Sequence, residues 1–280
     1  LQAPYQLLLY LLKKLSPQTK RLYFFTGKGG VGKTTFAMAL TKHLQQKGSN
    51  VIYYSFDQDP PFQLINALKV PFLHQTVKES AEIYIERKLS SKVVASWIMK
   101  TPFFKSLLNI TPSIGHMICL GHLIDRLEKE PNLTLVVDAP ASGHTLSLFN
   151  STQNFREMFQ RGPLVEDIHR MHRFLKNKDN LKVIILCLPN IMNIQEALEL
   201  KEGLQKLELV KPIITLNEVI SGIHVEEQVH LPEFLAKKLE IEQSLISKFK
   251  NDFASIIPLV NDISYENILK SLIKRMKDMV

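Results

Sequence analysis

The sequence has few cysteines and no apolar run long enough to cross a bilayer. Its two cysteines, Cys119 and Cys187, cannot form a disulfide framework, and no C-x-x-C pair is present for a structural zinc site. The longest apolar run near the start, residues 7–12, is six residues long, whereas a membrane-spanning helix needs about 20. Lysines follow this run instead of preceding it, so no signal peptide is expected. These absences predict a soluble, cytoplasmic protein.

Acidic residues are absent from residues 1–50, which contain eight of the 35 basic residues. The remaining 27 basic residues balance the 27 acidic ones, so the whole net charge of +8 comes from this segment. A basic segment can attract phosphate, nucleic acid or acidic lipid. No basic stripe with interleaved aromatics accompanies it, so we interpret it as a phosphate site with otherwise solvated charges. No nucleic-acid partner is expected.

The apolar pattern predicts an α/β fold. The 280 residues are 45% hydrophobic and 22% charged, as in ordinary globular proteins. Apolar strands are expected at 21–26, 51–56, 133–137, 181–188, 212–216 and 256–257, and helices at 4–15, 34–46, 194–207 and 266–279. Residues 61 to about 130 contain no expected strand and are predicted to be an insertion of helices broken at Pro71, Pro102 and Pro112. The prediction is one domain, 1–280, with a mostly parallel sheet covered by helices on both faces.

Residues 27–34 match the phosphate-loop pattern G-x-x-x-x-G-K-[ST] between an expected strand and an expected helix. Glycines allow the backbone to approach phosphate oxygens closely, and the following helix N-terminus favours an anion. Lys33 is predicted to contact the β- and γ-phosphates, and the Thr34 hydroxyl to bind Mg²⁺. The fold class is therefore a P-loop NTPase, and the expected nucleotide-binding residues are Gly27, Lys28, Gly29, Gly30, Val31, Gly32, Lys33, Thr34 and Thr35.

Asp138 ends the expected strand at 133–137, where a Mg²⁺-supporting acid of such a fold belongs. A buried carboxylate needs a partner, and metal-bound water supplies one. Asp138 is therefore predicted to support the metal, through water, with Thr34.

Two segments resemble one family of nucleotide-binding proteins. Lys28 gives the loop the form Lys-Gly-Gly-x-Gly-Lys-Thr, and residues 138–146 read Asp-Ala-Pro-Ala-Ser-Gly-His-Thr-Leu. Together they resemble the ArsA and tail-anchored-protein-targeting ATPases, relatives of MinD and ParA. The resemblance implies ATP as the nucleotide, a dimer in which Lys28 crosses to the partner's ATP, and a switch formed by Asp138, Gly143, His144 and Thr145. For His144, the alternatives to a switch role are a packing role and a direct role in the chemistry.

The segment 55–60 falls where this family has Ser-Thr-Asp-Pro-Ala-His. By that resemblance Asp57 orients and polarises the attacking water. The sequence departs at Gln58, Asp59 and Pro60, so Asp59 competes with Asp57 for this role and the rate of hydrolysis stays open. The predicted binding of the nucleotide is unaffected by these three differences from the family sequence.

The resemblance continues into the second half of the chain. Residues 213–217 look like the family strand that ends in an adenine-reading asparagine, which implies that Asn217 contacts the base. Residues 257–259 resemble its later Pro-Leu segment, which implies that Pro258 and Leu259 border the base. The match covers most of residues 21–280.

The resemblance implies a partner, but leaves the client open. The chain is expected to pair with itself or with a paralogous ATPase and to handle a hydrophobic client or membrane-protein partner. Residues 93–124, rich in Met and aromatics, form either a client groove or plain core. Two isolated cysteines do not favour metalloid binding, and 217–230 lacks the cysteines of a zinc-clamped dimer. The alternative function is a MinD/ParA-like positioning or scaffolding protein with slow turnover.

Overall fold

Parallel strands lie side by side in one sheet at the centre of the fold. A computed structural model describes residues 20–57, 59–102, 112–158, 163–208, 211–221, 232–262 and 264–275. Within them the sheet has seven strands in the order β3-β2-β4-β1-β5-β6-β7, and every neighbouring pair is parallel. The strands are β1 (Leu22–Gly27), β2 (Asn50–Ser55), β3 (Phe72–Leu73), β4 (Leu133–Asp138), β5 (Leu181–Cys187), β6 (Ile213–Val219) and β7 (Phe253–Pro258). Because β1 is the central strand and ends at Gly27, the phosphate loop that follows it lies at the middle of one edge of the sheet.

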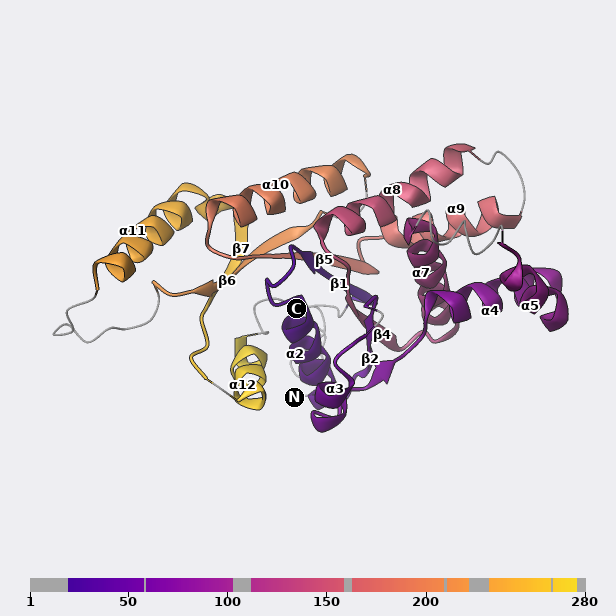
Figure 1. The fold of residues 1–280 in the computed structure, drawn as a ribbon, viewed down its shortest axis with the longest axis horizontal. Helices are drawn as coiled ribbons and strands as arrows, with labels where there is room; N and C mark the ends of the chain where they lie inside the picture. Colours follow the sequence, from indigo (N-terminus) through magenta and orange to yellow (C-terminus); the bar gives the residue numbers. More distant parts are fainter. Residues whose placement is uncertain are drawn as a thin grey trace, which may run out of the picture.

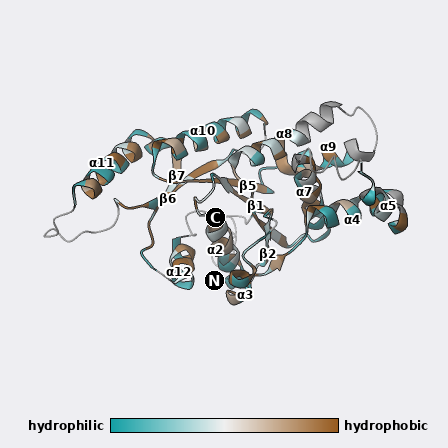
Figure 2. Ribbon diagram, viewed as in Figure 1, coloured by the Kyte–Doolittle hydropathy of each residue, from teal (hydrophilic) through white to brown (hydrophobic). Residues whose placement is uncertain are grey.

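Helices cover both faces of this sheet, so its strands are apolar on both sides (Figures 1 and 2). Leu22 and Phe24 of β1 pack into the core under α7, α8, α9 and α10, while Tyr23 and Phe25 pack into a second core under α2, α3 and α12. The helices are α2 (Lys33–Gln46), α3 (Phe62–Ala67), α4 (Val77–Leu89), α5 (Lys92–Lys100), α7 (Pro112–Lys129), α8 (Ser142–Met158), α9 (Pro163–Lys176), α10 (Ile191–Lys206), α11 (Glu233–Lys248) and α12 (Tyr265–Arg275), with a 3₁₀ turn at Lys250–Asp252. The predicted α/β class with a parallel sheet is confirmed.

The prediction that residues 61–130 contain no strand is wrong. Phe72 and Leu73 form β3, which pairs with Tyr53 and Tyr54 at the edge of the sheet. Two residues are too few to produce an alternating pattern, and the preceding Pro71 accepts a hydrogen bond from Tyr53 through its carbonyl without needing an N–H of its own. The expected strand at 256–257 is also longer, and begins at Phe253. The expected helix at 4–15 lies outside the described residues.

The insertion between β2 and β4 divides into a core part and an exposed part. In α7, the buried Met117, Leu120 and Leu123 belong to the main core. In α5, Val93 is 81% exposed and Trp97 is 67% exposed. Residues 103–111 lie outside the described part of the chain. The C-terminal part of the segment 93–124 is therefore core, while α5 presents apolar side chains to solvent.

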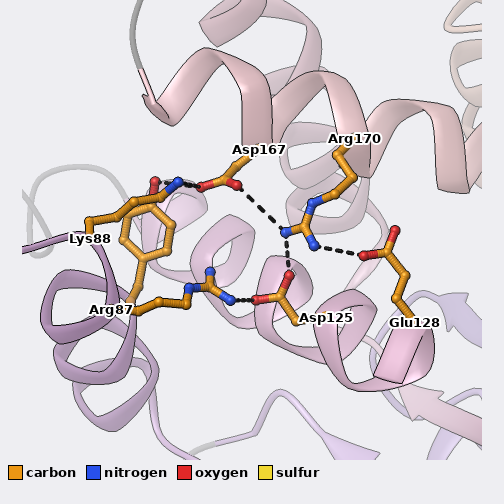
Figure 3. A network of polar contacts seen from close by, with 7 residues as sticks. Arg87, Lys88, Asp125, Glu128, Asp167 and Arg170 are labelled. Carbon is orange, nitrogen blue, oxygen red and sulfur yellow. Dashed lines mark hydrogen bonds and ion pairs between the residues drawn. The ribbon is translucent and has the colours of Figure 1, made fainter. Parts of the chain in front are cut away.

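An ion-pair network joins three helices around the insertion (Figure 3). The buried Asp125 of α7 accepts hydrogen bonds from Arg87 of α4 and Arg170 of α9. Arg170 also contacts Glu128 at 2.6 Å, and Lys88 contacts the Asp167 carboxylate at 2.7 Å. Because the network crosses between helices that are distant in sequence, it fixes α4 and α9 against α7.

Part of the basic excess at the start of the chain is used inside the fold. The Arg21 guanidinium donates to the carbonyls of Leu127, Glu130 and Leu133, which end α7 and begin β4. Lys20 lies 3.8 Å from the Asp179 carboxylate. None of the helices in the described part of the chain combines the length and apolar character needed to cross a bilayer.

Replacing Gly27 by alanine is expected to destabilise the fold. Gly27 has φ +138°, and a Cβ there would lie 2.2 Å from the Leu186 carbonyl oxygen on β5. Backbone strain of this kind costs about 1–3 kcal/mol before the clash is counted, and thermal denaturation should show a lower midpoint. Gly29→Ala is the matched control, because a Cβ at Gly29 meets nothing within 4 Å. An equal midpoint for both variants would contradict the close approach of β1 and β5.

Replacing Asp125 by asparagine should weaken the docking of α4 and α9. The substitution leaves Arg87 and Arg170 without their shared buried carboxylate, and is expected to cost about 1–3 kcal/mol because both arginines stay partly solvated. Chemical denaturation measures this loss. Glu202→Gln, in an exposed pair with Lys206, should leave the midpoint unchanged; an equally small effect at Asp125 would argue that the network is not structural.

Candidate functional site

The loop between β1 and α2 has the backbone of an anion site. Gly30 and Gly32 have φ +81° and +95°, which are readily available to glycine. Gly32 caps α2 without any side-chain hydrogen bond, and the first turn of α2 contains no acidic residue. The N–H groups at this helix terminus therefore face no competing carboxylate from their own turn, as binding of a phosphate requires.

A hydroxyl and a carboxylate meet beside this loop. The Thr34 Oγ1 donates to Asp138 Oδ2 at 2.6 Å, and the Tyr53 hydroxyl donates to the same oxygen at 3.1 Å. Thr34 lies at the start of α2, Asp138 ends β4, and Tyr53 belongs to β2. The carboxyl ends of the two strands and the N-terminus of α2 lie at the same edge of the sheet. Thr34 and Asp138, together with Lys33 and Asp57, line a pocket of about 330 Å³. The pocket brings together four of the predicted site residues.

Burial dominates the electrostatics of this pocket. Removal from water raises the pKa of Asp138, and the hydrogen bonds from Thr34 and Tyr53 and the charge of Lys33 offset only part of the effect. Burial likewise lowers the pKa of Lys33, against the attraction of Asp138 and Glu196. The Lys33 ammonium donates to the Lys28 carbonyl at 2.9 Å, at the start of the loop that it is predicted to serve.

The donor atoms of the pocket suit a hard divalent cation. Thr34 Oγ1 and the Asp138 carboxylate supply oxygen, the element that Mg²⁺ prefers, and the burial cost of Asp138 is what a cation would relieve. No group of three or more His, Cys, Asp or Glu side chains that could hold a metal occurs among the described residues. A magnesium ion here would therefore take most of its ligands from phosphate and water, as it commonly does in nucleotide sites.

Of the two acids that compete as water-orienting groups, Asp57 lines the pocket. Its N–H donates to Ser55 Oγ at 3.1 Å, and its Oδ1 accepts the Asp59 N–H at 3.3 Å. Asp59 is exposed and is not among the pocket-lining residues. Geometry therefore favours Asp57 over Asp59.

The predicted switch residues follow β4 directly. Thr145 is fully buried, accepts a hydrogen bond from Thr26 of β1 at 2.9 Å and donates to the Pro140 carbonyl at 2.9 Å. Gly143 and His144 lie in the first turn of α8 and are exposed. The buried threonine thus connects the segment 138–145 to the strand that carries the phosphate loop, while His144 remains accessible.

Lys28 makes its contact within its own chain. Its Nζ lies 3.3 Å from Glu196 Oε2 on α10, and both side chains are partly exposed. The predicted trans role of Lys28 is an expectation from the resemblance, and the contact with Glu196 shows where the side chain lies in a single copy.

The three residues expected near the adenine lie at the ends of β6 and β7. Asn217 is buried and donates from Nδ2 to the Val31 carbonyl of the phosphate loop at 3.1 Å. Pro258 ends β7, and the Leu259 N–H donates to the Val219 carbonyl at 2.9 Å. Asn217 therefore braces the loop itself, and its contact with a base stays a prediction.

Several side chains at the site were not found from the sequence. His116 of α7 lines the pocket and packs edge-on against Phe56, with ring centroids 5.2 Å apart. Burial lowers the pKa of His116, and the nearby His144 adds to the effect. The Tyr53 hydroxyl contacts Asp138, and the Tyr265 hydroxyl donates to the Thr35 hydroxyl at 2.8 Å. The sequence offers no spacing signal for these contacts, because each arises from packing between distant segments.

The two cysteines lie in the main core. Cys119 and Cys187 are both buried and free. Burial raises the pKa of both thiols, to about 12 for Cys187, which favours the protonated thiol over the thiolate.

Comparison with known proteins gives one family. The family described as anion-transporting ATPase (ArsA) matches residues 20–164. The chain is 22% identical over 254 residues to an "ATPase ASNA1 homolog" of Babesia bovis, covering 75% of this chain and 70% of that protein. It is 23% identical over 274 residues to "ATPase GET3A" of Arabidopsis thaliana, covering 84% and 76%. It is 24% identical over 245 residues to "ATPase BagA" of Mycobacterium tuberculosis, covering 79% and 70%. Each of these relatives is named an ATPase.

Asp138→Asn is expected to stabilise the chain when nucleotide and metal are absent. Folding raises the pKa of Asp138, so the wild type loses stability as pH rises from about 3.9, the pKa of an unfolded aspartate, through the raised folded value. Asparagine keeps an oxygen for Thr34 and Tyr53 without the buried charge, and a gain of about 1 kcal/mol corresponds to roughly 2–4 °C in the midpoint.

Thermal denaturation with a chelator at pH 7 and at about pH 3.5 checks this expectation, since the gain should disappear where Asp138 is protonated. A midpoint at pH 7 that falls below the wild type would contradict the burial cost assigned to Asp138.

Proposed function

Because this chain belongs to the ArsA family of anion-transporting ATPases, we propose that it is a magnesium-dependent ATPase that works as a nucleotide-driven dimeric switch. The observation that carries the proposal is the pocket in which Thr34 and Asp138 meet at 2.6 Å beside Lys33 and Asp57. It combines donors for phosphate, oxygen ligands for a metal and a carboxylate for water, which are the parts that phosphoryl transfer needs.

The residues of the pocket divide these tasks. The N–H groups of residues 29–34 and the Lys33 ammonium bind the β- and γ-phosphates. Thr34 would hold the metal directly, and Asp138 would hold it through water. A magnesium ion bound there would neutralise charge on the phosphate oxygens. Asp57 orients the attacking water, which its exposed carboxylate can reach at the rim of the pocket.

Two copies are proposed to pair across the edge of the sheet that carries the phosphate loop. Lys28 is half-exposed at this edge, so its ammonium can reach outward to the nucleotide of a second copy or of a paralogous ATPase. Ile191 and Met192 at the start of α10 are 41% and 66% exposed, and the same helix carries the Glu196 contact of Lys28. Exposed apolar side chains beside a functional lysine support a surface that a partner covers.

The client is proposed to be a hydrophobic segment or a membrane-protein partner that contacts the insertion. Val93 and Trp97 of α5 support this proposal, because large apolar side chains on one helix are otherwise left in water. The network of Asp125, Arg87 and Arg170 connects α4 to α7, and α7 carries His116 into the nucleotide pocket. A change at the nucleotide can therefore be passed to the insertion through α7.

ATP turnover measured together with light-scattering mass tests the proposal, with ATP, ADP and no nucleotide. The wild type should hydrolyse ATP and double its mass only with ATP. Lys28→Ala should lower turnover by about 100-fold or more, because it removes a charge that acts on the transition state. Asp57→Asn should lower turnover by roughly 10²–10⁴-fold and retain the ATP-bound dimer.

Lys47→Ala is the matched control, since Lys47 is an exposed lysine at the other end of α2. It should leave both turnover and mass unchanged. A wild type that stays monomeric with ATP, or a Lys28→Ala variant that hydrolyses ATP at the wild-type rate, would contradict the dimeric switch.

A further inference from the structure

A single carboxylate connects the phosphate loop to the switch segment. Glu196 Oε2 lies 3.3 Å from Lys28 Nζ, and Glu196 Oε1 accepts a hydrogen bond from the Ser142 hydroxyl. Lys28 belongs to the phosphate loop, whereas Ser142 is the first residue of α8, four positions after Asp138. The two oxygens of Glu196 therefore contact the two segments that respond to nucleotide in the proposed function.

The position of Glu196 on α10 favours this double contact. The helix is capped by Asn190, whose side chain accepts the Asn193 N–H at 2.9 Å, and Glu196 lies one turn further on the same face. Gly27, Lys28, Ser142, Asn193 and Glu196 all line one narrow crevice. The hydrogen bond from Ser142 and the nearby Lys28 lower the pKa of Glu196, so the carboxylate is charged at neutral pH.

The crevice also contains an acceptor with no donor. Asn193 Oδ1 is buried and has no hydrogen-bond partner in the described part of the chain. Buried polar atoms are normally paired, so this oxygen is an unused acceptor in a crevice that Lys28 also lines. The amine of Lys28, with three hydrogens to donate, is the cation that borders the crevice.

We propose that Glu196 is a positioning residue that holds Lys28 on its own chain. Through its hydrogen bond with Ser142, Glu196 also couples the position of Lys28 to the switch segment. The inference rests on the proposed function, in which Lys28 leaves to contact a second copy's nucleotide. When the lysine leaves, Glu196 keeps its hydrogen bond from Ser142 and its attraction to Lys33, so the contact at the start of α8 changes with the position of Lys28. Glu196 acts through Lys28 and Ser142 in this proposal, and so is a positioning residue and not a catalytic one.

The ion pair between Lys28 and Glu196 is weak enough to be broken when a nucleotide binds. Lys28 and Glu196 are 44% and 33% exposed, and partly solvated pairs of this kind hold weakly. The several negative charges of a nucleotide can therefore compete for the lysine. A fully buried pair would resist this exchange.

The test measures how accessible Lys28 is in the nucleotide-free chain. The 280-residue chain is pulse-labelled with an amine acetylating reagent, and the modified Lys28 peptide is quantified by mass spectrometry against the Lys47 peptide of the same sample. Glu196→Gln should speed labelling of Lys28 roughly two- to fivefold, the range expected for loss of an exposed pair. The ATP concentration for half-maximal dimerisation should fall by a similar factor.

Glu199→Gln is the matched control, because Glu199 is an exposed acid on the same helix and the substitution removes the same charge. It should leave labelling of Lys28 unchanged. Glu196→Asp gives a second variant in case the glutamine variant does not fold. Its shorter carboxylate cannot span both Lys28 and Ser142, so it should also speed labelling.

Equal labelling of Lys28 in the wild type and in the folded Glu196 variants would overturn the proposal. Faster labelling in the Glu199 variant to the same extent would also overturn it, since the effect would then be one of general charge. Failure of the wild type to dimerise with ATP is a different result: it contradicts the proposed function, while the labelling of Lys28 still decides whether Glu196 holds the lysine.

Discussion

The hydrogen bond between Thr34 and Asp138 is the contact around which the site is organised. It requires that the carboxyl ends of β1 and β4 and the N-terminus of α2 lie at the same edge of the sheet. The parallel order of the strands places them there. On the other side of β1, the backbone at Gly27 approaches β5 so closely that a side chain there would clash with the Leu186 carbonyl. Asp138 stays buried at a cost in free energy. The fold bears this cost at the place where a cation and a phosphate would remove it.

The sequence predicted the parts of the fold and site that depend on local chemistry. Glycine spacing together with Lys33 and Thr34 predicted the phosphate loop, because few backbones other than a tight anion loop need that pattern. The apolar run before Asp138 predicted a buried strand and placed the acid at its end. Membership of the family was predicted from the segments at 27–34 and 138–146, and the family match over residues 20–164 confirms it.

The remaining features depend on packing between distant segments, which periodicity does not encode. Glu196 contacts Lys28 across 168 positions of sequence, and His116 enters the pocket from a helix of the insertion. Strand β3 escaped prediction because two residues carry no alternation. Lys28 shows the difference most clearly. Its presence in the loop was readable from the sequence, whereas its partner in a single copy became visible only when α10 was placed beside the loop.

The most direct test of the central claim, that Lys28 acts on the nucleotide of a second copy, is ATP turnover in a mixture of two inactive variants. In a dimer of Lys28→Ala with Asp57→Asn, the Lys28→Ala chain keeps its own Asp57 and receives Lys28 from its partner. Equimolar mixing should restore about a quarter of the wild-type rate, because half of randomly formed dimers are mixed and each has one complete site. A mixture as inactive as its components, with mixed dimers present, would contradict action of Lys28 between copies.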